Sequence, residues 1–126
     1  MKNSNELIGR ILLGSIFLMA GISKISGYEG TAGYMDSMGV PGGLLPLVIL
    51  LEIVAGLMVI VGYKTQWAAY ALAGFTLIAA FIFHFNFADQ IQSILFMKNM
   101  AISGGLIILA VSTAGKFSVD SKFVKQ

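Results

Sequence analysis

The chain alternates four long apolar runs with short polar clusters. A helix that rises ~1.5 Å per residue needs about 20 apolar residues to cross a bilayer, and each run approaches that length. The third run is the cleanest, because it holds no charged residue between Lys64 and Asp89. The pattern predicts an all-α integral membrane four-helix bundle, a single domain over 1–126. Its spans cover about 7–25, 44–63, 67–88 and 97–114.

The longest connection, residues 27–43, separates the first two runs. It closes with Gly39-Val40-Pro41-Gly42-Gly43, a sequence that no helix continues through. We therefore expect a short interfacial helix between the first and second spans, ended by this turn.

The basic residues predict the orientation of the bundle. One side would carry five lysines, and the other only two, beside three acids. Because cytoplasmic loops are rich in lysine and arginine, both termini are expected to be cytoplasmic. The lysines of the cytoplasmic side are Lys2, Lys64, Lys116, Lys122 and Lys125, and those of the other side are Lys24 and Lys98.

Composition limits the chemistry. The 126 residues include only eight basic and six acidic side chains, and the mean hydropathy is +0.87, which excludes an ordinary soluble globule. Four spans consume ~80 residues, so no room remains for a catalytic domain outside the membrane. With no cysteine and one histidine, His84, we expect no haem or iron–sulfur cluster on this chain alone. A net charge of +2 without a basic stripe gives no indication of nucleic-acid binding.

Glu52 is the most informative residue. It lies eight positions into the second span, about 12 Å below the outer boundary, where an isolated carboxylate is costly. It should therefore be protonated, paired with a cation or hydrogen-bonded to a ligand. Intramembrane acids usually mark ligand sites or pathways, while the competing interpretation is a structural salt bridge that fixes the register of the helices.

Other polar groups are predicted to reach the same outer half from the remaining spans. On the first span Lys24 reaches it, and Lys24 shares a helical stripe with glycines and with Arg10 near the cytoplasmic end, so both charges point into the bundle. Small residues beneath a polar group leave room for an elongated apolar ligand with a polar head. The predicted site has Glu52 and His84 as catalytic residues, no metal, and Lys24, Lys98, Asn99 and Arg10 as substrate-binding residues.

Each of these residues has a structural alternative. The two lysines can extend to the outer head groups, and Arg10 can anchor to phosphate. His84 can be satisfied by a neighbouring helix, and Asn99 can hydrogen-bond between helices. Thioethers near the imidazole would suit Cu(I), but without a close Met-x-Met pattern flexible apolar packing is favoured. The methionines concerned are Met35, Met38, Met97 and Met100.

Several of these segments together resemble the DoxX family over almost the whole chain. They are Gly9 to Gly14 with Phe17, Gly21 and Lys24; Gly39-Val40-Pro41; Glu52 with Gly56 and Gly62; His84; and Lys98-Asn99 with Ser103-Gly104-Gly105-Leu106. The resemblance implies a multi-pass protein of the bacterial inner membrane. Relatives are discussed as quinol- or thiosulfate-linked oxidoreductase subunits, or as membrane partners of redox-stress enzymes.

Three functions follow as hypotheses. The first is a quinone- or quinol-interacting subunit of a membrane redox system, with its polar site in the outer half of the bundle. The second is a non-enzymatic scaffold for a redox or stress-response partner. The third is a small-molecule or proton conduit, which short helices disfavour unless a homo-oligomer encloses the path. The expected partners are the lipid bilayer, a redox protein and further copies of the chain.

Overall fold

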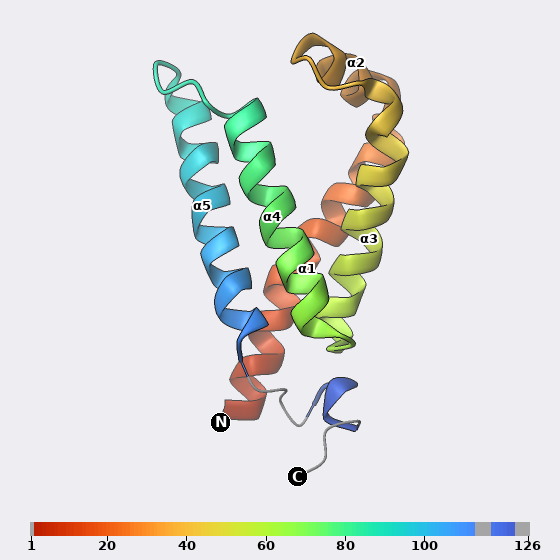
Figure 1. Cartoon of the computed structure of the whole chain (residues 1–126), viewed down its shortest axis with the longest axis vertical. Helices are drawn as coiled ribbons and strands as arrows, with labels where there is room; N and C mark the ends of the chain where they lie inside the picture. Colours follow the sequence, from red (N-terminus) through yellow and green to blue (C-terminus); the bar gives the residue numbers. More distant parts are fainter. Residues whose placement is uncertain (1, 113–116, 123–126) are drawn as a thin grey trace.

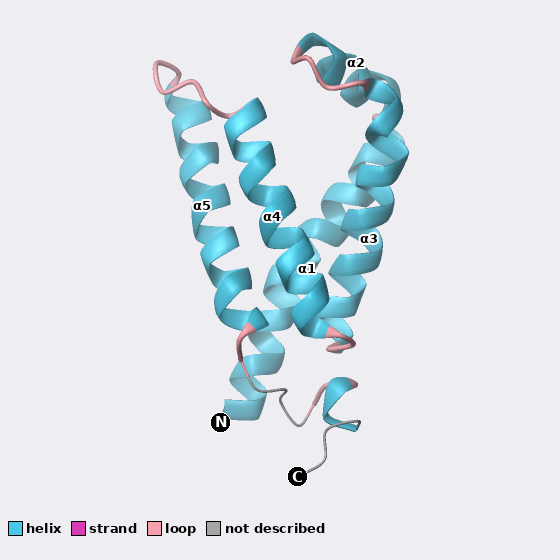
Figure 2. Cartoon of the chain, viewed as in Figure 1, coloured by secondary structure: helices cyan, strands magenta, loops and turns pink. Residues whose placement is uncertain are grey.

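The computed structural model describes residues 2–112 and 117–122, and in these residues all regular structure is helical (Figures 1 and 2). Four of the helices are long and apolar enough to cross a membrane, which confirms the all-α, four-span prediction. The elements are α1 (Lys2–Ser26), α2 (Tyr28–Ser37), the 3-10 helix η1 (Gly42–Leu44), α3 (Leu45–Val61), α4 (Thr65–Phe83), α5 (Gln90–Ala110) and the 3-10 helix η2 (Asp120–Lys122).

The long helices form two pairs. α1 packs along α3, α4 packs along α5, and α3 also contacts α4. Figure 1 shows the two pairs separating toward the end of the bundle that carries α2, while the start of α1 and η2 lie at the opposite end. A shared apolar core joins the pairs lower in the bundle. It contains Phe17, Ala55, Val59, Ala68, Ala69, Leu72, Ala73, Leu106 and Ala110.

The outer surface of the bundle is apolar. Only 17–33% of the most apolar part of each long helix is buried inside the chain. Large side chains point outward instead, including Leu12 (69% exposed), Trp67 (74%) and Ile108 (68%). In water such a surface would be unfavourable, whereas acyl chains solvate it, so the distribution of apolar residues fits a protein surrounded by lipid.

Glycines bring α1 and α3 into backbone contact. A methyl group added at Gly14 would lie 2.5 Å from Cγ1 of Ile60 and 2.7 Å from the carbonyl oxygen of Gly56. A methyl at Gly56 would lie 3.0 Å from the carbonyl oxygen of Gly14. Dispersion contacts must hold membrane helices together because lipid weakens the hydrophobic drive between them. The stripe of α1 predicted to face the bundle is buried, from Arg10 through Gly14 and Phe17 to Gly21.

The connection between α4 and α5 differs from the prediction. α4 ends at Phe83 rather than near residue 88, and α5 begins at Gln90 rather than near residue 97. Asp89 explains the early start, because its Oδ1 accepts hydrogen bonds from the backbone amides of Ile91 (2.9 Å) and Gln92 (3.3 Å) as an N-cap. Hydropathy finds only the apolar part of such a helix. The predicted end of the fourth span, at residues 113–114, lies outside the described residues.

The helix predicted between the first two spans is present as α2. Gly39 terminates it in the left-handed conformation (φ +83°), and the Val40 amide donates to the carbonyl oxygen of Met35 at 2.9 Å. Asp36 Oδ1 then accepts from the Gly42 amide at 2.7 Å and so fixes the turn into α3. Met35 is buried, so α2 is packed against the rest of the bundle.

Candidate functional site

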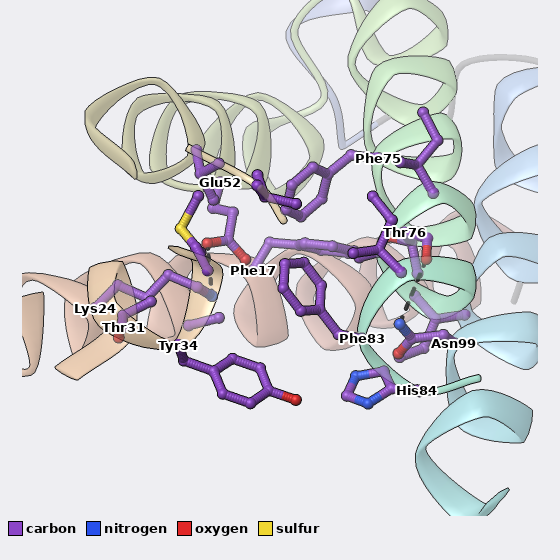
Figure 3. A pocket seen from close by; sticks show the side chains of 18 of the residues that line it. Phe17, Lys24, Thr31, Tyr34, Glu52, Phe75, Thr76, Phe83, His84 and Asn99 are labelled. Atoms are coloured by element: carbon purple, nitrogen blue, oxygen red, sulfur yellow. Dashed lines mark hydrogen bonds and ion pairs between the residues drawn. The ribbon is translucent and has the colours of Figure 1, made fainter. Parts of the chain in front are cut away.

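A cavity of about 420 Å³ lies between the two helix pairs, toward the end of the bundle that carries α2. All five α-helices contribute to its wall, and most of the lining is aliphatic or aromatic. The polar side chains that reach it are Lys24, Thr31, Tyr34, Glu52, Thr76, His84 and Asn99. Figure 3 shows this arrangement, with Glu52 and Lys24 on one side and His84 and Asn99 on the other.

An ion pair between α1 and α3 forms one wall. Lys24 Nζ lies 2.9 Å from Glu52 Oε1, and the Glu52 side chain is only 4% exposed, against 28% for that of Lys24. Apart from this ammonium, no described residue donates a hydrogen bond to Oε1 of the carboxylate. The close approach of the helices at Gly21 makes the pairing possible, since a methyl there would lie 3.3 Å from Cβ of Glu52.

The opposite wall is organised by α4 and α5. His84 follows the last turn of α4, and its Nδ1 lies 2.8 Å from Oε1 of Gln92. Asn99 uses Nδ2 to donate to the carbonyl oxygen of Thr76 at 3.4 Å. These contacts hold the imidazole and the amide on the cavity side of the α4–α5 pair, with the Asn99 carbonyl oxygen left as an acceptor.

Aromatic rings line the space between the two walls. Tyr34 of α2 and Phe83 of α4 are stacked, with ring centroids 5.6 Å apart and planes inclined by 29°. Phe17 and Phe75 also line the cavity. In Figure 3 the Tyr34 side chain extends across the cavity toward His84. Flat apolar walls with polar groups at two sides suit a planar ring that carries polar substituents.

The structure brings together four of the six residues predicted for the site. Glu52, His84, Lys24 and Asn99 all line the cavity, whereas Arg10 and Lys98 do not. Lys98 is exposed on α5. Arg10 lies 14 positions before Lys24 on α1, a separation of about 21 Å along the helix axis.

Arg10 is fully buried near the opposite end of the bundle. Its Nε is paired with Glu6, Nη1 donates to the carbonyl oxygen of Ile60 at 2.6 Å, and Nη2 donates to that of Phe117 at 2.8 Å. All three nitrogen atoms of the guanidinium therefore have partners within the protein. The group neither lines the cavity nor binds lipid phosphate.

Sequence reasoning missed the contribution of α2. Thr31 and Tyr34 belong to a short helix outside the four spans, and a search for polar residues within spans passes over them. One signal could have found Tyr34. It is an aromatic residue in a short glycine-rich segment, directly before the span that carries the charged Glu52. Gln92 was missed for the same reason, because it lies in the turn of α5 that hydropathy left out.

The methionines differ in their surroundings. Met35 lines the cavity, while Met38 and Met97 are 40% and 64% exposed. Among the described residues, no group of three or more histidine, cysteine, aspartate or glutamate side chains is placed to hold a metal ion.

The family model of DoxX matches residues 6–85, which run from the first turns of α1 past the end of α4 and include Lys24, Glu52 and His84. The chain belongs to the DoxX family. It is 52% identical over 120 residues to the inner membrane protein YqjF of Escherichia coli, covering 95% of this chain and 92% of YqjF. It is 32% identical over 123 residues to the inner membrane protein YphA of the same organism, covering 92% of this chain and 88% of YphA.

A more distant similarity reaches Bacillus subtilis. There the chain is 34% identical over 76 residues, 60% of this chain and 56% of the relative, to a protein named "Putative oxidoreductase CatD". No solved structure matches the chain. The four apolar helices and the inner-membrane relatives make this DoxX protein a multi-pass protein of the bacterial inner membrane.

Proposed function

We propose that this DoxX protein is a quinone- or quinol-interacting subunit of a membrane redox system. The observation that carries the proposal is the Lys24–Glu52 ion pair, which faces an aromatic-walled cavity opposite His84 and Asn99. A quinone head group is a planar ring with oxygen atoms at opposite ends, and its isoprenoid tail is soluble in lipid. The cavity has polar groups on two opposite sides, where the oxygen atoms of the ring would lie, and apolar walls between them, where the ring itself would lie.

The size of the cavity supports this choice. About 420 Å³ lies within the ordinary range for small-molecule sites and suits a substituted ring with the first part of a tail. The remaining tail would extend between the separated helix pairs into the bilayer. With both termini cytoplasmic, as we propose, the head group would lie in the outer half of the membrane.

Proton transfer gives the polar residues a role. Oxidation of a quinol releases two electrons and two protons, and a carboxylate and an imidazole beside the ring can accept protons. Glu52 and His84 would then be the catalytic residues, while Lys24 and Asn99 position the oxygen atoms of the ring. The electrons would pass to a partner protein, since this chain has the ligands for neither a bis-histidine haem nor a cysteine-ligated cluster. The name of the Bacillus relative, an oxidoreductase, supports a redox context.

Binding of a short-tailed ubiquinone analogue to the purified protein in nanodiscs tests the proposal. We expect saturable binding at one site, and a loss of affinity for the reduced form of at least about tenfold in Glu52→Gln, because the carboxylate that accepts from a ring hydroxyl is removed. Glu29→Gln is the matched control, since it makes the same chemical change on an exposed residue of α2 outside the cavity. Absence of saturable binding in the wild-type protein would reject the proposal.

The ion pair also favours a second candidate, a non-enzymatic scaffold for a redox or stress-response partner. In that case Lys24 and Glu52 fix the register of α1 against α3 and bind no ligand. Glu52→Gln would then lower the unfolding temperature in detergent without changing the affinity for any quinone. Measuring stability and binding on the same samples separates the two functions.

A further inference from the structure

We infer that the cavity binds the reduced, hydroxyl-bearing form of its ligand more tightly than the oxidised form. The inference rests on the proposed function and specifies which member of the quinol/quinone couple the site is built for. It follows from the hydrogen-bonding capacity that the two polar walls leave unused.

On the α4–α5 wall, Gln92 determines the hydrogen-bonding state of His84. The partner of His84 Nδ1 is the Oε1 atom of Gln92, 2.8 Å away. With the carbonyl oxygen of Gln92 as the acceptor, Nδ1 is the donor and carries the hydrogen. In the neutral ring Nε2 is then an acceptor, and no described residue donates to it. This wall therefore presents a ring nitrogen that requires a donor.

The α1–α3 wall also presents an unused acceptor. The carboxylate of Glu52 is paired with the Lys24 ammonium at 2.9 Å, and Oε1 accepts no other hydrogen bond in the part of the chain that the structure describes. A buried carboxylate oxygen can accept more than one hydrogen bond, and hydrogen bonds to a charged group stabilise more than those to a neutral one. A ligand hydroxyl would supply the missing donor.

The donors of the cavity do not discriminate between the two forms. Lys24 and Tyr34 can each donate to a ligand oxygen, whether that oxygen is a carbonyl or a hydroxyl. A quinol hydroxyl can accept from such a donor and at the same time donate to Glu52 or His84. A quinone carbonyl can only accept, so it gives no hydrogen bond to His84 Nε2 and none to the Glu52 carboxylate beyond its pairing with Lys24.

The reduced form thus gains up to two hydrogen bonds that the oxidised form cannot make, one on each wall of the cavity. We expect its affinity to exceed that of the oxidised form by at least about tenfold, the effect of one to two hydrogen bonds. Because the site then stabilises the reduced state, the two-electron midpoint potential of the bound couple should rise by about 30 mV or more.

The test compares the dissociation constants of a short-tailed ubiquinone analogue in its oxidised and reduced forms, measured anaerobically in nanodiscs. His84→Phe keeps a ring but removes the acceptor, and Glu52→Gln replaces an obligate acceptor by an amide that can turn a donor toward a carbonyl. Both variants should reduce the preference for the quinol, whereas Glu29→Gln should keep it. The tailless hydroquinone serves as a second probe, since tight binding without a tail would indicate a free phenol rather than a membrane quinol as the ligand.

The outcomes separate this inference from the function beneath it. If neither form binds, the proposed function fails and the inference fails with it. If both forms bind equally, or the quinone binds more tightly, the inference is wrong while a quinone-binding function stands. A preference for the quinol that His84→Phe leaves intact would also overturn the assignment of His84, even if Glu52→Gln proved too unstable to study.

Discussion

Arg10 on α1 closes the C-terminal end of α3, because its Nη1 donates to the carbonyl oxygen of Ile60 at 2.6 Å. The carbonyl groups of a last helical turn have no partner within the helix, and a guanidinium supplies several donors at once. The same side chain binds the carbonyl oxygen of Phe117. One buried residue therefore joins α1, α3 and the segment that precedes η2.

Replacing this guanidinium should destabilise the fold without affecting the cavity. We expect Arg10→Met to lower the free energy of unfolding by about 3 kcal/mol or more, since Glu6 and the carbonyl oxygen of Ile60 lose their partner in a buried setting. Thermal unfolding in detergent measures the effect, with Lys98→Met as an exposed control. If Arg10→Met had normal stability but a reduced affinity for quinone, Arg10 would be a ligand-binding residue and its structural role would be wrong.

The α1–α3 crossing should not tolerate a methyl group at its closest point. In Gly14→Ala the new carbon would meet the backbone oxygen of Gly56 at 2.7 Å, so the helices must move apart. We expect a loss of about 1–3 kcal/mol in stability. Gly74→Ala is the matched control, because Gly74 lies within α4 with nothing within 4 Å of the added carbon. Equal unfolding temperatures for the two variants would contradict the close packing.

Asp120 should act as a cap for a helix far from it in sequence. Its Oδ1 and Oδ2 accept hydrogen bonds from the backbone amides of Lys64 (2.6 Å) and Thr65 (2.9 Å) at the start of α4. Asp120→Ala should cost about 1 kcal/mol, and amide exchange at Thr65 should become faster. Asp120→Asn keeps one acceptor and is expected to lose less. Unchanged exchange at Thr65 in the alanine variant would refute the capping role.

A double-mutant cycle measures the Lys24–Glu52 ion pair directly. Lys24→Met leaves the Glu52 carboxylate buried without its cation. We therefore expect the free energy of unfolding of this variant to fall by about 1–3 kcal/mol. Adding Glu52→Leu should restore part of the lost stability, because the unpaired charge is removed. If the two single effects simply add in the double variant, the side chains do not interact in the membrane, and the geometry of this wall of the cavity would need revision.

Much of the fold could be predicted from the sequence because a membrane restricts the options. Four apolar runs in a chain of 126 residues admit little besides four spanning helices, and the stripe from Arg10 to Lys24 correctly indicated the buried face of α1. The ends of the helices could be predicted less well from the sequence. Asp89 starts α5 well before its apolar part, and hydropathy does not register a capping residue.

The sequence by itself determined that Glu52 needs a partner within the bundle, because a lone carboxylate is costly there. Only the tertiary structure decided that the partner is Lys24 and that Arg10 and Lys98 lie away from the cavity. Depth in the membrane is a local property that hydropathy reports, whereas facing a common space depends on how helices cross. That crossing is set by contacts such as Gly14 against Gly56, between residues far apart in the chain. The same reason accounts for Tyr34, which reaches the cavity because α2 folds back over it.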